Sequence, residues 1–231
     1  FLLLGLWLLN QRRDFLAGVC FFFSIIKPQL VHFVLLAVGL WVLRERRWRV
    51  MLGGVIGLAF TLLVFTFLRP SWLADYLGLV GGHVFTQYTT STLGGVLQAW
   101  FGTTLGRYAG VLLLPLVPWI FRLADEHGWL TAMNVSLLFS IPLAPYGFGF
   151  DLIVLVPVIV QLIAWLWTRC LKPMRRWIIV VGLLAFYGFS LWLLSISGVP
   201  YHFFAWIPLW LGGLYAIAWS ECSEALLVLE V

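Results

Sequence analysis

The sequence predicts an all-α, polytopic integral membrane protein with about nine transmembrane segments. Of its 231 residues, 63% are hydrophobic and 10% are charged, and the mean hydropathy is +1.03. Because a soluble domain is about 45–50% apolar and about 25% charged, this chain needs a bilayer to bury its apolar surface. A soluble enzyme, a disordered chain and a disulfide scaffold are therefore excluded. The net charge of +5 is divided among short clusters between apolar runs, so no nucleic-acid partner is expected.

Nine apolar runs predict the segments in order. They cover residues 1–9, 15–26, 30–43, 50–68, 108–121, 129–143, 152–168, 177–195 and 203–220. A helix needs about 20 residues to cross the hydrocarbon core, and four of these runs reach 17 to 19 residues. The first run lacks the preceding basic residues of a signal peptide. We expect it to be the end of a helix, and residues 1–231 to be a single, N-terminally truncated transmembrane domain.

The second and third runs are predicted to form one short helical hairpin. Residues 15–26 number only 12 and are too few to span the bilayer alone. Lys27-Pro28-Gln29 separates them from the next run. Pro28 has no backbone N–H and disfavours helix at the residue before it, so the hairpin should break there.

The distribution of basic residues predicts the orientation in a cell membrane. If loops alternate sides from a cytoplasmic 10–14, the cytoplasmic set holds 11 of the 14 basic residues: Arg12, Arg13, Arg44, Arg46, Arg47, Arg49, Arg122, Arg169, Lys172, Arg175 and Arg176. The other side holds Lys27, Arg69 and Arg107. This asymmetry follows the positive-inside rule. The C-terminus is then cytoplasmic, and an outer loop of about 69–107, with a short interfacial helix over Leu93–Phe101, is extracytoplasmic.

Basic residues are scarce on the outer side, so each is a candidate for binding an anionic ligand. Lys27 lies in the hairpin turn beside Gln29. The alternative is a lysine whose stem stays in lipid while its ammonium group reaches the headgroups. Arg69 and Arg107, at the two ends of the outer loop, are second candidates.

Five polar residues on the outer side are candidates for lining a substrate site, and each has an ordinary alternative. Asp75 and His83 lie in the outer loop, where the alternative is a solvated position. Asp151 opens a membrane helix, where an acid stabilises the helix N-terminus. Tyr201 and His202 lie at the mouth of the last helix, where amphipathic side chains are common.

Other sequence features exclude several kinds of site. There is no Walker motif, no G-x-S-x-G and no H-E-x-x-H. Cys20, Cys170 and Cys222 are scattered without metal-ligand spacing, and we expect them to be small apolar residues in or near the membrane. No metal site is predicted, and a requirement for a divalent metal is left open.

Several segments together resemble glycosyltransferase family 87, whose members are integral membrane mannosyltransferases of the GT-C superfamily. Residues 12–18 followed by 26–29 resemble its "R-x-x-AG…KPQ" hairpin. Residues 48–49 and then 70–76 (PSWLADY) are similar to its next stretch. Residues 142–155 are similar to its "SPY…YDLVLL" segment, with Phe150 where the family often has Tyr. These similarities extend to about residue 160.

The resemblance implies a GT-C-like enzyme that transfers a hexose, with mannose expected, from a polyprenyl-phosphate donor. The acceptor would be an extracytoplasmic glycan or glycolipid, and no cofactor is predicted. Lys27 and Gln29, with Arg69 and Arg107, would bind the donor phosphate, and Tyr146 would help to line the site. GT-C enzymes carry a catalytic acid in the first outer loop. That residue is expected upstream of Phe1, so the 231 residues alone should be inactive.

Two other functions remain open. One is a polysaccharide or lipid-carrier transporter that uses the broken hairpin as a gate. Because almost every charge lies at the end of an apolar run and only one hairpin is broken, the sequence weighs against transport. The other is a non-catalytic membrane subunit that packs against partner proteins.

Overall fold

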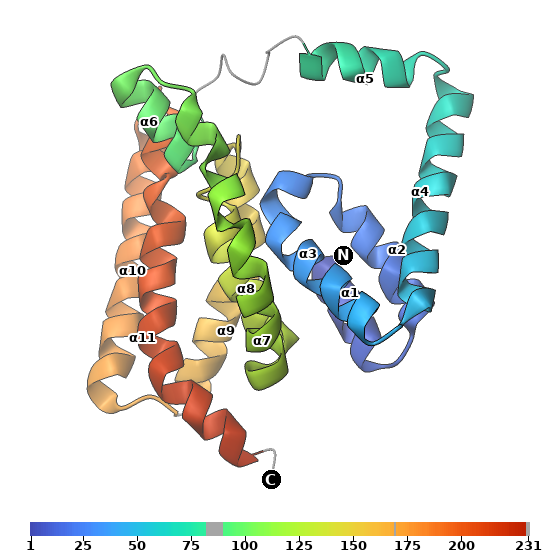
Figure 1. Cartoon of the computed structure of the whole chain (residues 1–231). Coiled ribbons are helices and arrows are strands. Elements are labelled where there is room, and N and C mark those ends of the chain that lie inside the picture. Colours follow the sequence, from blue (N-terminus) through green and yellow to red (C-terminus); the bar gives the residue numbers. More distant parts are fainter. Residues whose placement is uncertain (82–89, 169, 230–231) are drawn as a thin grey trace.

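The computed structural model describes residues 1–81, 90–168 and 170–229, which form helices and connecting turns without a strand (Figure 1). The α-helices are α1 (Leu2–Asn10), α2 (Asp14–Ser24), α3 (Pro28–Arg44), α4 (Trp48–Leu68), α5 (Trp72–Gly81), α6 (Leu93–Phe101), α7 (Val117–His127), α8 (Trp129–Ser140), α9 (Val156–Trp167), α10 (Pro173–Ser195) and α11 (Trp206–Leu229). The 3₁₀ helices are η2 (Leu105–Leu116), η3 (Gly149–Leu155) and η4 (Tyr201–Phe204). The predicted all-α class is confirmed.

Five helical stretches of the described chain are long and apolar enough to cross a membrane. They are Trp48–Leu68, Leu105–His127, Gly149–Trp167, Pro173–Ser195 and Tyr201–Cys222. Their outer surfaces are apolar: Leu63 and Phe67 on α4, for example, are 70% and 85% exposed. Such surfaces are stable against lipid rather than water. The other apolar helices that are described are shorter, so the count of nine segments remains a prediction.

The predicted break between the second and third runs is present, but α2 and α3 hardly pack on each other: α2 packs mainly on α1 and α4, and α3 packs on α7 and α8. Helix α2 ends at Ser24 and α3 begins at Pro28, with Lys27 as its N-cap residue. Proline fits this first position because the helix makes no use of its missing N–H. The break therefore places Lys27 between two helix ends.

Helices α2 and α4 pack with their backbones in contact. A Cβ atom added to Gly53 would lie 2.0 Å from the carbonyl oxygen of Phe15, and one added to Gly18 would lie 1.9 Å from that of Val50. Small residues permit this close approach between membrane helices. The contact ties α4 to the N-terminal hairpin.

Helix α8 is buried among α3, α7 and α11. Polar side chains join it to α9 and α11: the amide nitrogen of Asn134 and the hydroxyl of Tyr215 donate to Gln161 Oε1 at 2.5 and 2.7 Å. Gln161 donates to Thr131 Oγ1 at 3.3 Å. Such contacts stabilise helix association where water is absent.

The segment between residues 69 and 107 differs in part from its prediction. The helix expected over Leu93–Phe101 is present with the same bounds, but α5 (Trp72–Gly81) was not predicted. The run expected over 108–121 extends from Leu105 to His127, and its first half is a 3₁₀ helix. Pro115 lies in this half, and a proline cannot donate the hydrogen bond that an α-helix needs.

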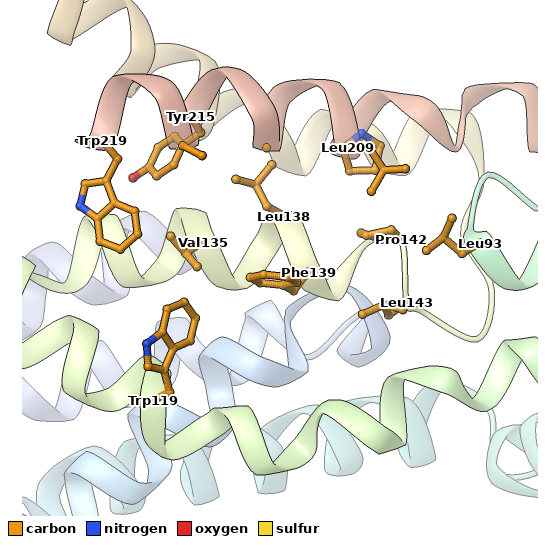
Figure 2. Close-up of a pocket in the computed structure, with 13 residues that line it drawn as sticks. Leu93, Trp119, Val135, Leu138, Phe139, Pro142, Leu143, Leu209, Tyr215 and Trp219 are labelled. Carbon is orange, nitrogen blue, oxygen red and sulfur yellow. The ribbon is translucent and has the colours of Figure 1, made fainter. Parts of the chain in front are cut away.

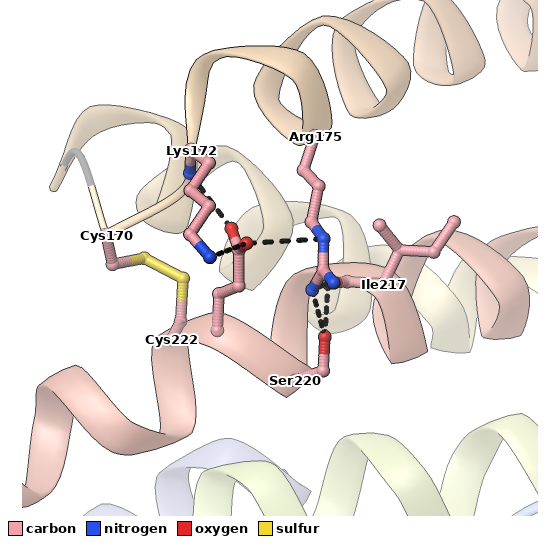
Figure 3. A network of polar contacts seen from close by, with 7 residues as sticks. Cys170, Lys172, Arg175, Ile217, Ser220 and Cys222 are labelled. Atoms are coloured by element: carbon pink, nitrogen blue, oxygen red, sulfur yellow. Dashed lines mark hydrogen bonds and ion pairs between the residues drawn. A yellow bond between two sulfur atoms is a disulfide. The ribbon is translucent and has the colours of Figure 1, made fainter.

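The expectation for two of the cysteines is wrong, because Cys170 and Cys222 form a disulfide (Figure 3). The turn between α9 and α10 folds back against α11. The two cysteines are 52 residues apart, so the sequence gives no sign of this contact. Polar contacts join the same elements: Glu221 accepts from the backbone N–H of Lys172 at 2.9 Å and lies 3.2 Å from Arg175 Nε.

The two ends of the helices differ in charge. The turns between α1 and α2, between α3 and α4, and between α9 and α10 carry basic clusters and lie toward the lower end in Figure 1. Helices α5 and α6 lie at the upper end. We call these the basic end and the outer end. Which side of a membrane each faces remains a prediction.

Candidate functional site

Two segments that lie far apart in the sequence meet at an ion pair. Lys27 Nζ, from the hairpin turn, contacts Asp151 Oδ1 at the start of η3. The Asp151 side chain is 6% exposed, whereas that of Lys27 is 38% exposed. The other carboxylate oxygen of Asp151 accepts from the backbone N–H of Phe148 at 3.0 Å. Asp151 therefore caps the N-terminus of its own helix, which was the non-functional role predicted for it. It also holds the Lys27 ammonium group.

Aromatic rings surround this ion pair. Lys27 Nζ lies 4.4 Å from the ring centre of Phe150 and 5.9 Å from that of Phe148. The Tyr201 ring packs against Phe148 with its centre 6.0 Å away. Aromatic faces attract cations, so the rings help to hold the Lys27 ammonium group and leave its exposed side as the approach for an anion.

The segment around Tyr146 is fixed by backbone hydrogen bonds from the residues at the start of α6 and just before it. Ser91 donates its backbone N–H to the carbonyl of Gly147 at 2.9 Å, and Leu93 donates to that of Pro142 at 2.8 Å. Burial raises the pKa of the Tyr146 phenol, and the charges of Tyr76 and Asp151 raise it further. Tyr146 therefore stays protonated near neutral pH and can donate a hydrogen bond.

Gln29 and Arg107 line a common cavity of about 170 Å³ beside this segment. His32, Leu143 and Pro145 also line it. Arg107 is 3% exposed and donates from Nε to Gln98 Oε1 at 2.7 Å. The structure thus places two of the predicted phosphate-binding residues on one cavity, next to the hairpin turn that carries a third.

An apolar groove of about 450 Å³ runs between α7, α8 and α11 (Figure 2). Leu93, Pro142 and Leu143 lie at one end, and Trp119, Tyr215 and Trp219 lie toward the other. Leu143 also lines the cavity that contains Gln29 and Arg107. One end of the groove therefore lies beside the cavity of the candidate site.

The other predicted site residues make no contact with the Lys27–Asp151 ion pair that the structure describes. Arg69 and Asp75 pair with each other at 3.0 Å, and both side chains are largely exposed. His202 stacks on Phe203, and its buried Nδ1 has no hydrogen-bond partner among the described residues. His83 lies outside the described residues. Arg69 and Asp75 therefore form an exposed ion pair with each other.

Sequence reasoning missed several residues that shape the site. Phe148 and Phe150 flank the ammonium group, and Thr92 caps α6 by accepting from Gly95 N at 3.2 Å. Only the spacing of Phe148, three residues before Asp151, could have indicated a capping contact. Among the described residues, no group of three His, Cys, Asp or Glu side chains is placed to hold a metal ion.

Comparisons of the chain with family models, with curated proteins and with solved structures found no match. The similarity to glycosyltransferase family 87 therefore remains a prediction that depends on the short segments described above. The hairpin turn and the segment around Tyr146 and Asp151 carry most of it, and these are the two that meet at the ion pair.

Proposed function

We propose that the protein is a membrane glycosyltransferase that takes a hexose, with mannose the first candidate, from a polyprenyl-phosphate donor. The acceptor would be a glycan or glycolipid on the extracytoplasmic side. The observation that carries the proposal is the contact between Lys27 and Asp151, which are 124 residues apart. It joins the two segments that most resemble family 87.

The charges near this contact suit a lipid-linked phosphate. Lys27 has three donor protons and uses one toward Asp151, so its exposed side can bind a phosphate oxygen. In this proposal Gln29 and Arg107, which line one cavity, stabilise the same phosphate or its departure. Fixed cations stabilise the charge that develops on a phosphate leaving group. Asp151 would act as a positioning residue for Lys27.

The apolar groove is suited to bind the lipid tail of the donor. Its lining in Figure 2 is hydrophobic and aromatic, and it ends near Leu143, beside the cavity of Gln29 and Arg107. An isoprenoid tail in this groove would leave its phosphate at the level of Lys27. Binding energy from the tail would then hold the reacting group in place.

Donor turnover with and without the Lys27 charge tests this function. Native membranes containing the protein, expressed from its complete gene, are given labelled polyprenyl-phosphate mannose, and release of polyprenyl phosphate is measured. Lys27→Met should slow release about ten- to a hundredfold, since a charge-assisted contact to phosphate contributes roughly 1.5–3 kcal/mol. The control is Lys172→Met, an exposed lysine at the basic end, which should leave release unchanged.

A second variant separates loss of function from loss of fold. Lys27→Met leaves the nearly buried Asp151 without its partner, which is destabilising. The double variant Lys27→Met/Asp151→Asn removes both charges and should fold while remaining slow. Normal release by the double variant, or no release by the wild type above membranes that lack the gene, would overturn the proposal.

One observation favours a second candidate, a lipid-carrier transporter. The ion pair joins the N-terminal hairpin to the segment before α9, so its breakage could open a path between them. A transporter would move the intact donor across the membrane without releasing polyprenyl phosphate. The same assay distinguishes the two functions, because only the enzyme cleaves the donor.

A further inference from the structure

A second cavity, of about 950 Å³, lies at the basic end between α1, α3 and the start of α8. It shares no lining residue with the groove or the cavity of the candidate site. Its walls combine apolar, aromatic and charged side chains: Leu3, Leu6, Trp7, Leu9, Asn10, Arg12, Trp41, Glu45, Arg47, Gly128, Trp129 and Leu130. This cavity is therefore separate from the proposed donor site.

Three tryptophans give this cavity an amphipathic wall. Trp41 and Trp129 pack edge to face with ring centres 5.6 Å apart, and Trp7 is 53% exposed. Tryptophan is enriched where membrane helices meet the headgroup region, because its ring contacts acyl chains while its N–H meets polar groups. The wall therefore matches the boundary between a lipid tail and its headgroup.

Two arginines supply positive charge to the same cavity. Arg47 is held in place by Asp14, at 2.6 Å, and by the ring of Trp41, at 4.9 Å. Arg12 is exposed, and no hydrogen bond or ion pair of its side chain is found within the described chain. Glu45 at the rim lies 3.8 Å from Arg44. Across the two turns, residues 10–14 and 44–49 contain six arginines and two acids, which leaves an excess of positive charge.

The backbone of these turns gives a second observation. Arg12 and Arg46 have positive φ values of 56° and 53°, the only non-glycine residues in the described chain that do. Each follows the end of a helix, and the next residue donates back to the last turn: Arg13 to Leu8 at 2.9 Å and Arg47 to Val42 at 3.0 Å. Glycine is the usual residue at this position because it avoids strain. Arginine is thus present twice where the backbone favours glycine.

We infer that this cavity binds an anionic phospholipid from the leaflet at the basic end. The phosphate would contact Arg12 and the positive turns, and the upper part of an acyl chain would lie along Trp7, Trp41 and Trp129. Basic pockets between membrane helices bind anionic headgroups in this way. A zwitterionic lipid would gain the same apolar contacts but would bring a positive group to the arginines.

Lipid titration of the purified protein in a neutral detergent tests the site. Binding of phosphatidylglycerol and of phosphatidylcholine is followed by native mass spectrometry and by the shift in unfolding temperature. Phosphatidylglycerol should bind at least about tenfold more tightly. Inorganic phosphate and glycerol phosphate should give no shift at millimolar concentrations, because they lack the tail. Equal affinity for the two lipids, or equal protection by a free phosphate, would overturn the inference.

Arg12→Gly is the sharpest variant because it should change stability and binding in opposite directions. Glycine relieves the backbone strain, so the lipid-free protein should unfold at a higher temperature than wild type. Its preference for phosphatidylglycerol should fall about five- to tenfold. The control, Arg176→Gln, removes an exposed arginine of the same end outside this cavity and should keep the preference. An equal loss in both variants would show diffuse attraction to charge instead of a site.

Discussion

Two ion pairs, one at the outer end and one at the basic end, hold their charges in opposite ways. At the outer end, Lys27 pairs with an Asp151 side chain that is only 6% exposed. At the basic end, Arg44 pairs with Asp125, and the two side chains are 61% and 47% exposed. An exposed pair contributes little to stability, about 0–1 kcal/mol, whereas removal of one partner from a buried pair is costly. The pair of Lys27 with the nearly buried Asp151 is therefore the one that requires a specific explanation.

This difference suggests that the two ends bind different phosphate-containing ligands. The outer end combines a held cation, a small cavity that Gln29 and Arg107 line, and an apolar groove, which suits one lipid-linked phosphate. The basic end combines many arginines with tryptophans, which suits the headgroups of a membrane surface. The two proposals together place a phosphate at each end, with different numbers of fixed contacts.

The largest expected effect concerns the compartment that each end faces. If the basic end is cytoplasmic, Cys170 and Cys222 are in a reducing environment, where disulfides rarely persist. The disulfide that the structure contains should then be reduced in living cells, so nearly all molecules should carry two free thiols when cells are lysed in a thiol-alkylating reagent. The disulfide should form again after oxidation. Gel shift of the alkylated protein measures the fraction. A fully oxidised pair in living cells would reverse the assigned orientation.

A smaller effect is expected where α4 is tied to the hairpin that carries Lys27. Gly53→Ala places a methyl group against the carbonyl of Phe15 and should destabilise the fold by about 1–3 kcal/mol. The matched control is the adjacent Gly54→Ala, whose methyl group would lie an ordinary 3.7 Å from Gly18 O. Thermal unfolding in detergent compares the two variants. If both unfold at the same temperature, the close contact between α2 and α4 is not formed.

The smallest effect is expected from neutralising Asp151. Asp151→Asn keeps an acceptor for the N–H of Phe148 but no longer holds the Lys27 ammonium group by charge. Because Lys27 is partly exposed and water can solvate it, we expect polyprenyl phosphate to bind about three- to tenfold more weakly, about 1 kcal/mol. A binding isotherm with the purified protein measures this. Tighter binding would mean that Asp151 competes with the phosphate for Lys27.

The sequence predicted those features that depend on local chemistry. Pro28 fixed the break between α2 and α3, and apolar runs located the long helices to within a few residues. The pairing of Lys27 with Asp151 and of Cys170 with Cys222 could not be derived, because each joins segments that only tertiary packing brings together. Helix α5 was missed because it lies in a segment whose glycines and polar residues resemble a loop.

One crossed binding measurement tests the distinction between the two ends most directly. Lys27→Met/Asp151→Asn and Arg12→Gly proteins are each titrated with polyprenyl phosphate and with phosphatidylglycerol in the same neutral detergent. We expect the first variant to bind polyprenyl phosphate at least about tenfold more weakly while its affinity for phosphatidylglycerol is unchanged. Arg12→Gly should show the reverse pattern. If each variant weakens both ligands to the same extent, the two ends do not hold separate phosphate sites and the central claim is wrong.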